Sequence, residues 1–335
     1  MEKRFIESSF CEQDLTYEVP LRPQTLNDFD GQEKAKKQLE VVIGAAKKRK
    51  DVLGHLLFSG PPGLGKTTLS HIIAHHMGCS IIVTSGPVIE RAGDLAGILT
   101  NLKTGDILFI DEIHRLNRTV EEYLYPAMED FQLDLVVDSG ANSRSVKVSL
   151  NRFTLIGATT RMGLLSGPLR SRFNTNLRLD YYELECIEKI IDRSARLLGL
   201  KCNKEALSEI SKRSRGTPRV ANNLLKWLRD YCEMHAPGQQ LSKEIAQKAL
   251  QMIDIDEKGL DEMDIRLLSA LVNQYGGGPV GLSTLAVAVG EEEHTIEEVH
   301  EPFLIMQGLL KRTPRGREAT QAAFAHLGKQ MREKP

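Results

Sequence analysis

The first half of the chain, to about residue 180, alternates short apolar runs with longer amphipathic stretches. Three of the apolar runs, at residues 55–58, 107–110 and 153–157, have the length expected of buried strands. Strands that alternate with helical stretches predict a parallel sheet joined by crossover helices. The expected fold class of this segment is therefore α/β.

A different pattern separates the second of these runs from the third. Residues 133–137 and 145–150 partly alternate apolar and polar positions on either side of Asp138, Gly140 and Asn142. A period of two that is interrupted by turn-forming residues predicts a β-hairpin. We expect this hairpin, at about residues 133–150, to be an insertion into the sheet domain.

From Glu183 the apolar positions follow a helical period. Four stretches predict a small all-helical unit, at residues 186–198, 204–213, 218–235 and 242–252. The acidic stretch 254–257 is the expected boundary to a third domain. We therefore expect domains at residues 1–182, 183–254 and 255–335.

The last of these domains has the pattern of a winged helix. Helices are predicted at residues 261–274 and 283–289, separated by a glycine-rich turn. A third helix is expected to begin at Thr295, because Thr295 and Glu298 have the spacing of a capping box. Two short apolar segments on either side of residues 313–317 suit a β-hairpin wing.

Composition narrows the class of protein. The 335 residues are 41% hydrophobic and 27% charged, and no apolar run approaches the length of about 20 residues that spans a bilayer. The N-terminus lacks the apolar core of a secretory signal, and the five cysteines are scattered without a CxxC pair. We therefore expect a cytoplasmic protein with no membrane partner. A net charge of -1 implies that any contact with nucleic acid is local.

The first chemical motif is a phosphate loop at residues 60–67, Gly-Pro-Pro-Gly-Leu-Gly-Lys-Thr. It lies between a predicted strand and a predicted helix, where backbone N–H groups and the helix N-terminus favour an anion. Lys66 would bind the β and γ phosphates, and the Thr67 hydroxyl would bind Mg²⁺. The motif predicts ATP or ADP as ligand.

The strand at residues 107–110 runs into Asp111 and Glu112. Alone this could be a buried strand with a solvated acidic end. Together with a phosphate loop it places Asp111 near the metal and Glu112 where it can orient the attacking water.

The strand at residues 153–157 runs into hydroxyl groups that end at Thr160, and Arg170 and Arg172 follow in a short loop. Hydroxyl groups at this position could sense the γ phosphate. Arginine pairs of this kind are often only partners in surface salt bridges. The order of the motifs along the chain is therefore stronger evidence for function than the arginine pair alone.

Phosphate loop, acidic strand end, hydroxyl-ended strand, arginine loop and helical unit follow one another in an order that resembles the AAA+ ATPase family over about residues 20–255. The resemblance implies that Thr160 is the first sensor, that Arg172 reaches the ATP of a neighbouring subunit, and that Arg219 is the second sensor. Pro218 suits the first helical position, which would aim Arg219 at the phosphates. An arginine that acts on a neighbour also implies a homo-oligomeric ring, usually a hexamer.

Further segments narrow the resemblance, and they lie at residues 21–23, 86–87, 93–95, 125–130, 157–161 and 276–281. Together they resemble the RuvB family, the AAA+ motors of bacterial Holliday-junction branch migration, from about Leu21 to Leu327. Motifs and resemblance together predict a nucleotide site made of Leu21, Arg22, Gly63, Gly65, Lys66, Thr67, Thr68, Glu129, Asp130, Phe131, Arg172, Tyr182 and Arg219.

The resemblance also implies partners. The hairpin at about residues 133–150 would dock on RuvA, with Leu135 and Val137 as contact points, although a solvated hairpin without a partner is the alternative. The RuvC resolvase would join a larger complex.

The third helix of the winged-helix domain carries Glu297, Glu298 and Glu301, which would repel DNA phosphates. The wing instead holds a cluster of basic residues, which suits backbone contacts without sequence preference. The resemblance indicates Arg312 and Arg317, with Arg315 as a helper, and a solvated basic turn is the alternative.

The favoured hypothesis is an ATP-driven DNA translocase, or helicase, that drives branch migration of Holliday junctions in homologous recombination and DNA repair. A clamp-loader-like or protein-remodelling ATPase is the alternative enzyme. A nucleotide-gated scaffold is a third hypothesis, and it requires Glu112 to be idle.

Overall fold

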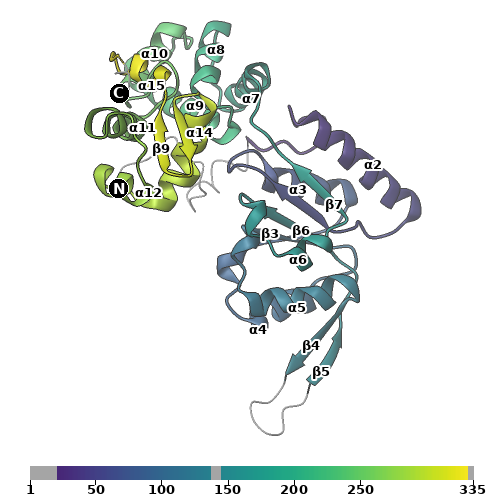
Figure 1. Ribbon diagram of the computed structural model, residues 1–335. Coiled ribbons are helices and arrows are strands. Elements are labelled where there is room, and N and C mark those ends of the chain that lie inside the picture. Colours follow the sequence, from purple (N-terminus) through teal and green to yellow (C-terminus); the bar gives the residue numbers. More distant parts are fainter. Residues whose placement is uncertain (1–20, 137–144, 331–335) are drawn as a thin grey trace. The chain divides into compact units, whose positions relative to one another are not determined.

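A five-stranded parallel sheet lies at the centre of the N-terminal part of the computed structural model, which describes residues 21–136 and 145–330 (Figure 1). The strand order is β2-β3-β6-β1-β7. The strands are β1 (Leu56–Ser59), β2 (Ile81–Ser85), β3 (Ile107–Asp111), β6 (Thr154–Thr159) and β7 (Thr175–Arg178). The three strands predicted from the sequence are the middle three, so the predicted parallel α/β fold is confirmed.

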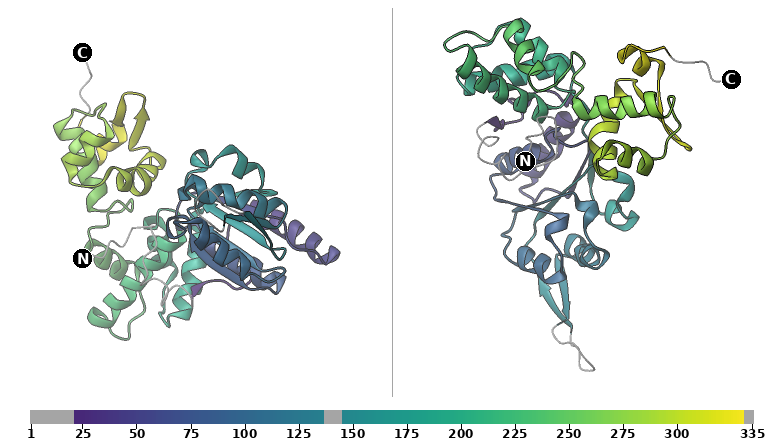
Figure 2. Two further views of the ribbon diagram at one scale, coloured as in Figure 1. Left: turned by 90° about the horizontal axis from the view of Figure 1, so that it is seen from below. Right: turned by 90° about the vertical axis from the view of Figure 1, so that its left-hand side faces the viewer.

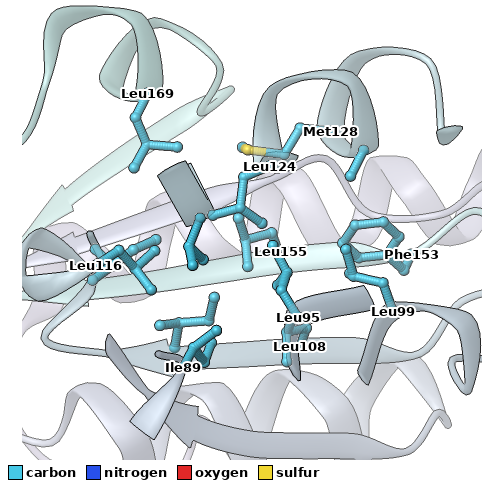
Figure 3. Packing of buried hydrophobic residues seen from close by; sticks show 14 of the residues in the cluster. Ile89, Leu95, Leu99, Leu108, Leu116, Leu124, Met128, Phe153, Leu155 and Leu169 are labelled. Carbon is cyan, nitrogen blue, oxygen red and sulfur yellow. The ribbon is translucent and has the colours of Figure 1, made fainter. Parts of the chain in front are cut away.

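Helices precede and connect the strands of this sheet. They are α2 (Glu33–Arg49), α3 (Lys66–Met77), α4 (Ala92–Thr100), α5 (Arg118–Glu129) and α6 (Gly167–Ser171), with short 3-10 turns at Gly86–Val88, Ile113–Arg115 and Met162–Leu164. Leu108 and Leu155 of the sheet meet Leu124 of α5 in one buried cluster (Figure 3). Each such side chain contributes about 2 kcal/mol through burial, so this cluster fixes α4 and α5 on the sheet.

The predicted hairpin is present between α5 and β6. Its strands β4 (Gln132–Val136) and β5 (Ser145–Ser149) pair in antiparallel register, and the hairpin projects from the body of its unit (Figure 2). Leu133 is buried in the core, whereas Val146 is 46% exposed. The expected turn and Val137 lie outside the described residues.

A helical unit follows the sheet domain. The chain divides into two compact units between Cys186 and Ile187. This division falls in the first turn of α7 (Leu184–Leu197), and α8 (Lys204–Arg213), α9 (Pro218–His235) and α10 (Lys243–Gln251) follow in the second unit, as the helical period predicted. None of the described helices has both the length and the apolar character needed to cross a lipid bilayer.

The C-terminal part has the order of a winged helix. It contains α11 (Glu262–Ser269), a π turn (Ala270–Gln274), α12 (Leu282–Val289), α13 (Glu293–Thr295), a second π turn (Ile296–His300), α14 (Glu301–Met306), β8 (Leu310–Thr313), β9 (Gly316–Ala319) and α15 (Gln321–His326). Strands β8 and β9 form the predicted antiparallel wing.

The predicted capping box at Thr295 is wrong. The third helical segment begins two residues earlier, at Glu293, and no side chain caps it. Gly290 ends α12 in the left-handed conformation at φ 71°, and the chain is already extended at Glu292. The turn after α12 therefore sets the start of the helix, and Thr295 lies inside it.

A buried histidine ties the sheet to the end of α5. The Leu155 amide donates to Nδ1 of His55 over 2.8 Å, so Nε2 carries the proton and donates to the Met128 carbonyl over 3.0 Å. Both bonds require a neutral ring, since a proton on Nδ1 would face the amide proton. Burial lowers the pKa of His55 below its ordinary value of 6.5.

This arrangement predicts a dependence of stability on pH. Below pH 6.5, the ordinary pKa, the unfolded chain binds a proton at this position more readily than the folded chain, so the free energy of unfolding falls as the pH is lowered. His55→Gln is expected to lose about 1 kcal/mol at pH 7 and to show a flatter decline between about pH 6.5 and pH 5. Urea unfolding at several pH values measures both effects, and an unchanged slope would contradict the assignment.

Candidate nucleotide and DNA sites

The turn between β1 and α3 accepts only glycine at its critical positions. Gly60, Gly63 and Gly65 have φ values of 138°, 76° and 97°, in the region that disfavours side chains. A Cβ on Gly60 would lie 2.2 Å from the Leu179 carbonyl oxygen. The backbone of the loop therefore lies close to the segment that follows β7. The N–H groups of the loop and the start of α3 form an anion site.

Lys66 is the first residue of α3, and it is only 6% exposed. Its Nζ donates to the carbonyl oxygens of Gly60 and Pro61 over 2.8 and 2.9 Å. The ammonium group is thus held at the loop that would surround a phosphate. Thr67 and Thr68 follow in the first turn of the same helix.

Tyr182 supports the loop from the far end of the unit. Its hydroxyl donates to the Leu64 carbonyl over 3.0 Å, and its ring lies against Gly31, where a Cβ would come within 2.7 Å. Burial raises the pKa of Tyr182, so the phenol stays protonated and keeps donating. Leu21 is buried and Arg22 is half-buried in the same unit.

The order β3-β6-β1 brings three strand ends together, because carboxyl ends of parallel strands share one edge of a sheet. The phosphate loop follows β1, Asp111 ends β3, and Thr160 directly follows β6. Thr67 and Asp111 offer a hydroxyl and a carboxylate oxygen, the hard donors that Mg²⁺ prefers. The donor set thus fits a Mg²⁺ ion beside a nucleotide.

The side chain of Glu112 is held by hydrogen bonds at the end of β6. Glu112 adopts a left-handed backbone conformation at φ 45°. The Thr160 hydroxyl donates to Oε2 of Glu112 over 3.0 Å, and Nδ1 of His114 lies 3.2 Å from the same oxygen. His114 is also 2.9 Å from the Thr159 hydroxyl. The sequence interpretation missed His114, whose only signal is its place three residues after Asp111.

Arg172 contacts its own chain at the end of α6. Its guanidinium donates to the Pro168 carbonyl over 2.8 Å and to Glu129 over 3.0 Å. The carbon of the guanidinium also lies 4.3 Å from the centre of the Tyr125 ring. The fold therefore brings together Arg172 and Glu129, two residues predicted for the nucleotide site.

The two residues after Glu129 differ in exposure. Asp130 is exposed, whereas Phe131 is half-buried and packs against His55 and Phe153. Phe131 therefore anchors the base of the hairpin.

Arg219 lies in the second unit, in the first turn of α9 behind Pro218, as its sequence position predicted. The turn before it contains Arg215, which is left-handed at φ 58° and 5% exposed. Arg215 donates to Asp264 of α11 over 2.5 Å and stacks on the Phe303 ring at 4.5 Å. The role of Arg219 at the phosphates stays a prediction.

A group of potential metal ligands surrounds the same arginine. Asp261, Asp264 and His300 bring their ligand atoms within 4.8 Å of one another. Because the guanidinium of Arg215 already neutralises Asp264, the group forms a salt-bridge network.

The wing arginines differ in accessibility. Arg312 and Arg315 are exposed, and Arg312 pairs with Glu297 at 3.0 Å. Arg317 is 8% exposed and pairs with buried Glu301 of α14. The predicted contact of Arg317 with DNA therefore stays a prediction. The Arg317 side chain points to the body of the domain, since β9 alternates and places this position inward.

The strand ends, the glycine loop and the helical unit together define a P-loop ATPase of the AAA+ class. Three family models match the chain in succession. They describe the Holliday junction DNA helicase RuvB P-loop domain at residues 21–179, the RuvB AAA lid domain at 182–256 and the RuvB C-terminal winged helix domain at 257–328. The chain belongs to the RuvB family.

Individual relatives agree with this assignment. The Holliday junction branch migration complex subunit RuvB of Protochlamydia amoebophila is 61% identical over 327 residues, which cover 98% of each chain. The corresponding subunit of Parabacteroides distasonis is 54% identical over 95% of this chain and 93% of its own length. The solved Holliday junction branch migration motor RuvB of Thermotoga maritima is 48% identical with a TM-score of 0.86, and the match covers 93% of this chain and 100% of that one.

The contacts of Glu112 generate a prediction. Glu112→Gln keeps the shape of the side chain and removes its charge, so ATP hydrolysis is expected to fall at least about 100-fold while ATP binding persists. Steady-state hydrolysis and binding of a fluorescent nucleotide measure the two properties separately. Glu122→Gln, which removes an exposed carboxylate that pairs with Arg118, is the matched control and is expected to behave like the wild type. Full activity of Glu112→Gln would support a scaffold instead.

Proposed function

We propose that this chain is the ATP-driven motor of Holliday-junction branch migration in recombination and DNA repair. The observation that carries the proposal is the presence, in one chain, of a complete phosphate loop with its acidic strand end and a winged-helix domain with exposed arginines. The RuvB relatives, named as branch migration subunits, support the same function. We place the protein in the cytoplasm, where bacterial DNA lies.

The proposed chemistry is positioning and charge stabilisation. Lys66 binds the β and γ phosphates, and Thr67 and Asp111 would hold Mg²⁺, which would neutralise phosphate charge. Glu112 orients the water, and Thr160 and His114 hold Glu112 until the γ phosphate is present.

The remaining residues of the proposed site close around the nucleotide. Arg219 of the same chain and Arg172 of the next subunit stabilise the charge that develops on the phosphates. Leu21, Arg22 and Tyr182 hold the nucleotide, and a hexameric ring is the assembly in which Arg172 finds a neighbouring ATP.

The proposed DNA contact is the tip of the wing. Arg312 and Arg315 are exposed there and bind phosphates without reading bases. Arg317 is proposed as a further phosphate contact, for which its ion pair with Glu301 would have to open.

The proposed partner surface is the hairpin of β4 and β5. Val146, opposite Leu135 in the register, is an exposed apolar residue on a projecting element. RuvA is the proposed partner on this hairpin, and RuvC is proposed to join through the larger complex.

The alternative enzyme is a clamp-loader-like or protein-remodelling ATPase. Both classes hydrolyse ATP, so hydrolysis alone does not separate them. Movement of the junction does, because a loader assembles partners without transporting DNA.

The test of the proposed function is a branch-migration assay on a synthetic four-way junction with RuvA and ATP. The wild type is expected to convert the junction, and Lys66→Arg is expected to lose conversion and hydrolysis by at least about 100-fold, because a bulkier cation replaces the ammonium group in a closed loop. ATP hydrolysis by the wild type without movement of the junction would favour the alternative enzyme.

The wing predicts salt-dependent DNA binding. Arg312→Ala is expected to weaken binding to all duplex sequences equally and to reduce the slope of log affinity against log salt by about one. Fluorescence anisotropy at several salt concentrations measures both. Arg196→Ala, an exposed lid arginine that pairs with Asp192, is the control with an unchanged slope. A wild-type slope in Arg312→Ala would remove Arg312 from the interface.

The hairpin predicts a separable recruitment defect. Val146→Asp places a charge on the proposed apolar contact, so binding to RuvA is expected to fall at least about tenfold while ATP hydrolysis without RuvA is unchanged. Lys147→Ala, at the neighbouring position on the other face of β5, is the control. Retained RuvA binding by Val146→Asp would contradict the docking surface.

A further inference from the structure

Arg172 is held by a set of contacts that its proposed role alone does not explain. The guanidinium lies over the Tyr125 ring at 4.3 Å, and its two terminal nitrogens donate to Pro168 and Glu129. The Nε of Arg172 is buried and hydrogen-bonds no residue in the described part of the chain. The aromatic face therefore supplies a main contact of the guanidinium plane.

The Tyr125 ring is itself fixed by hydrogen bonds. Its hydroxyl donates to Glu121, one turn earlier on α5, over 2.6 Å. The same carboxylate oxygen accepts a hydrogen bond from the Ser166 hydroxyl. Ser166 in turn caps α6, because its side chain accepts from the Leu169 amide over 3.2 Å. One carboxylate thus fixes both the ring and the start of the helix that ends at Arg172.

Buried side chains pack beside this group. Leu124 of α5 and Leu169 of α6 belong to the buried cluster on the sheet (Figure 3). Burial raises the pKa of Tyr125, and the hydrogen bond to Glu121 adds to this effect, so the phenol stays protonated. The ring therefore keeps its orientation across the physiological range of pH.

The contact with Glu129 differs from the contact with Tyr125. The side chain of Glu129 is 55% exposed, so the carboxylate is able to turn into solvent. An incoming phosphate is a stronger partner for a guanidinium, because it offers more charge and several acceptor oxygens. The partner of one terminal nitrogen of Arg172 can therefore be replaced, while the Tyr125 ring continues to support the plane of the guanidinium.

We propose that Tyr125 is a positioning residue for Arg172, and that Glu129 pairs with the guanidinium until a phosphate of the neighbouring subunit's ATP takes the place of Glu129. This inference rests on the proposed function of Arg172. The ring holds the plane of the guanidinium, which lowers the entropy lost when the transition state forms. Tyr125 acts through Arg172 and does not touch the nucleotide.

The test compares four variants of the full-length protein, assembled on DNA with RuvA. Arg172→Ala measures the proposed function itself, and Tyr125→Leu removes the aromatic face. Tyr125→Phe keeps the face and removes the hydroxyl. Tyr123→Leu is the matched control, because Tyr123 lies on the same helix and packs against the same cluster. The measurements are kcat and KM for ATP, with thermal unfolding as a check of the fold.

The expected results separate positioning from stability. Arg172→Ala is expected to lose at least about 1000-fold in kcat. Tyr125→Leu is expected to lose about 5- to 30-fold in kcat with KM within about twofold, the range of a partly desolvated cation–π contact. Tyr125→Phe is expected to retain kcat within about threefold. Tyr123→Leu is expected to match the wild-type kcat even where its unfolding temperature falls.

A mixing experiment tests which subunit carries the defect. Lys66→Arg disables its own phosphate loop and leaves its Arg172 intact. Rings mixed from Lys66→Arg and Tyr125→Leu subunits are expected to hydrolyse ATP at a higher kcat per intact phosphate loop than Tyr125→Leu alone, because some intact loops then receive a supported arginine. A defect confined to the Tyr125→Leu subunit's own site would give no such gain and would overturn the proposal.

The remaining outcomes distinguish the proposed role of Arg172 from the proposed role of Tyr125. Normal kcat in Tyr125→Leu with a low kcat in Arg172→Ala would overturn the positioning role and leave the proposed function of Arg172 intact. Normal kcat in Arg172→Ala would overturn both. Equal losses in Tyr125→Leu, Tyr125→Phe and Tyr123→Leu would assign the tyrosines to stability alone and overturn the proposal.

Discussion

The tight reversal of the chain between β1 and α3 is the constraint on which the other features of the site depend. Gly60 passes so close to Leu179, just beyond β7, that a single Cβ would overlap a carbonyl oxygen. This turn places Lys66 at the start of α3, and the strand order then places Asp111 and Thr160 beside it. A side chain in the turn would move either the helix start or the edge strand, so the spacing of all three groups depends on glycine at this position.

Features with a continuous signal in the sequence were predictable, and features set by distant contacts were not. The middle strands, the lid helices and the phosphate loop each follow from a single uninterrupted pattern. Strands β2 and β7 lie at the sheet edges, where burial is incomplete. The start of the third helical segment at Glu293 follows from the turn after Gly290, and the capping pattern at Thr295 had no influence on it.

The candidate site shows the same division. Sequence order identified Lys66, Asp111 and Glu112, but the hold of Thr160 and His114 on Glu112 depends on two strands about 45 residues apart in the chain meeting at one edge. The charges of the winged helix were apparent as separate acidic and basic groups. Their pairing was not, because Arg312 and Arg317 reach Glu297 and Glu301 only after the wing folds back on the helix. The acidic helix thus neutralises part of the wing, and this leaves Arg315 as an exposed arginine at its turn.

The buried contact between Arg215 and Asp264 has a mechanical consequence for the second unit. Arg215 lies four residues before Arg219, in the turn that leads into α9, and Asp264 belongs to the first helix of the winged-helix domain. Pulling the two apart would break a buried ion pair between a guanidinium and a carboxylate, at a cost of about 3–5 kcal/mol. Any motion that supplies less energy than this moves the start of α9 and α11 as one rigid body. A displacement of Arg219 is therefore expected to move α11, the first helix of the winged-helix domain, by the same amount.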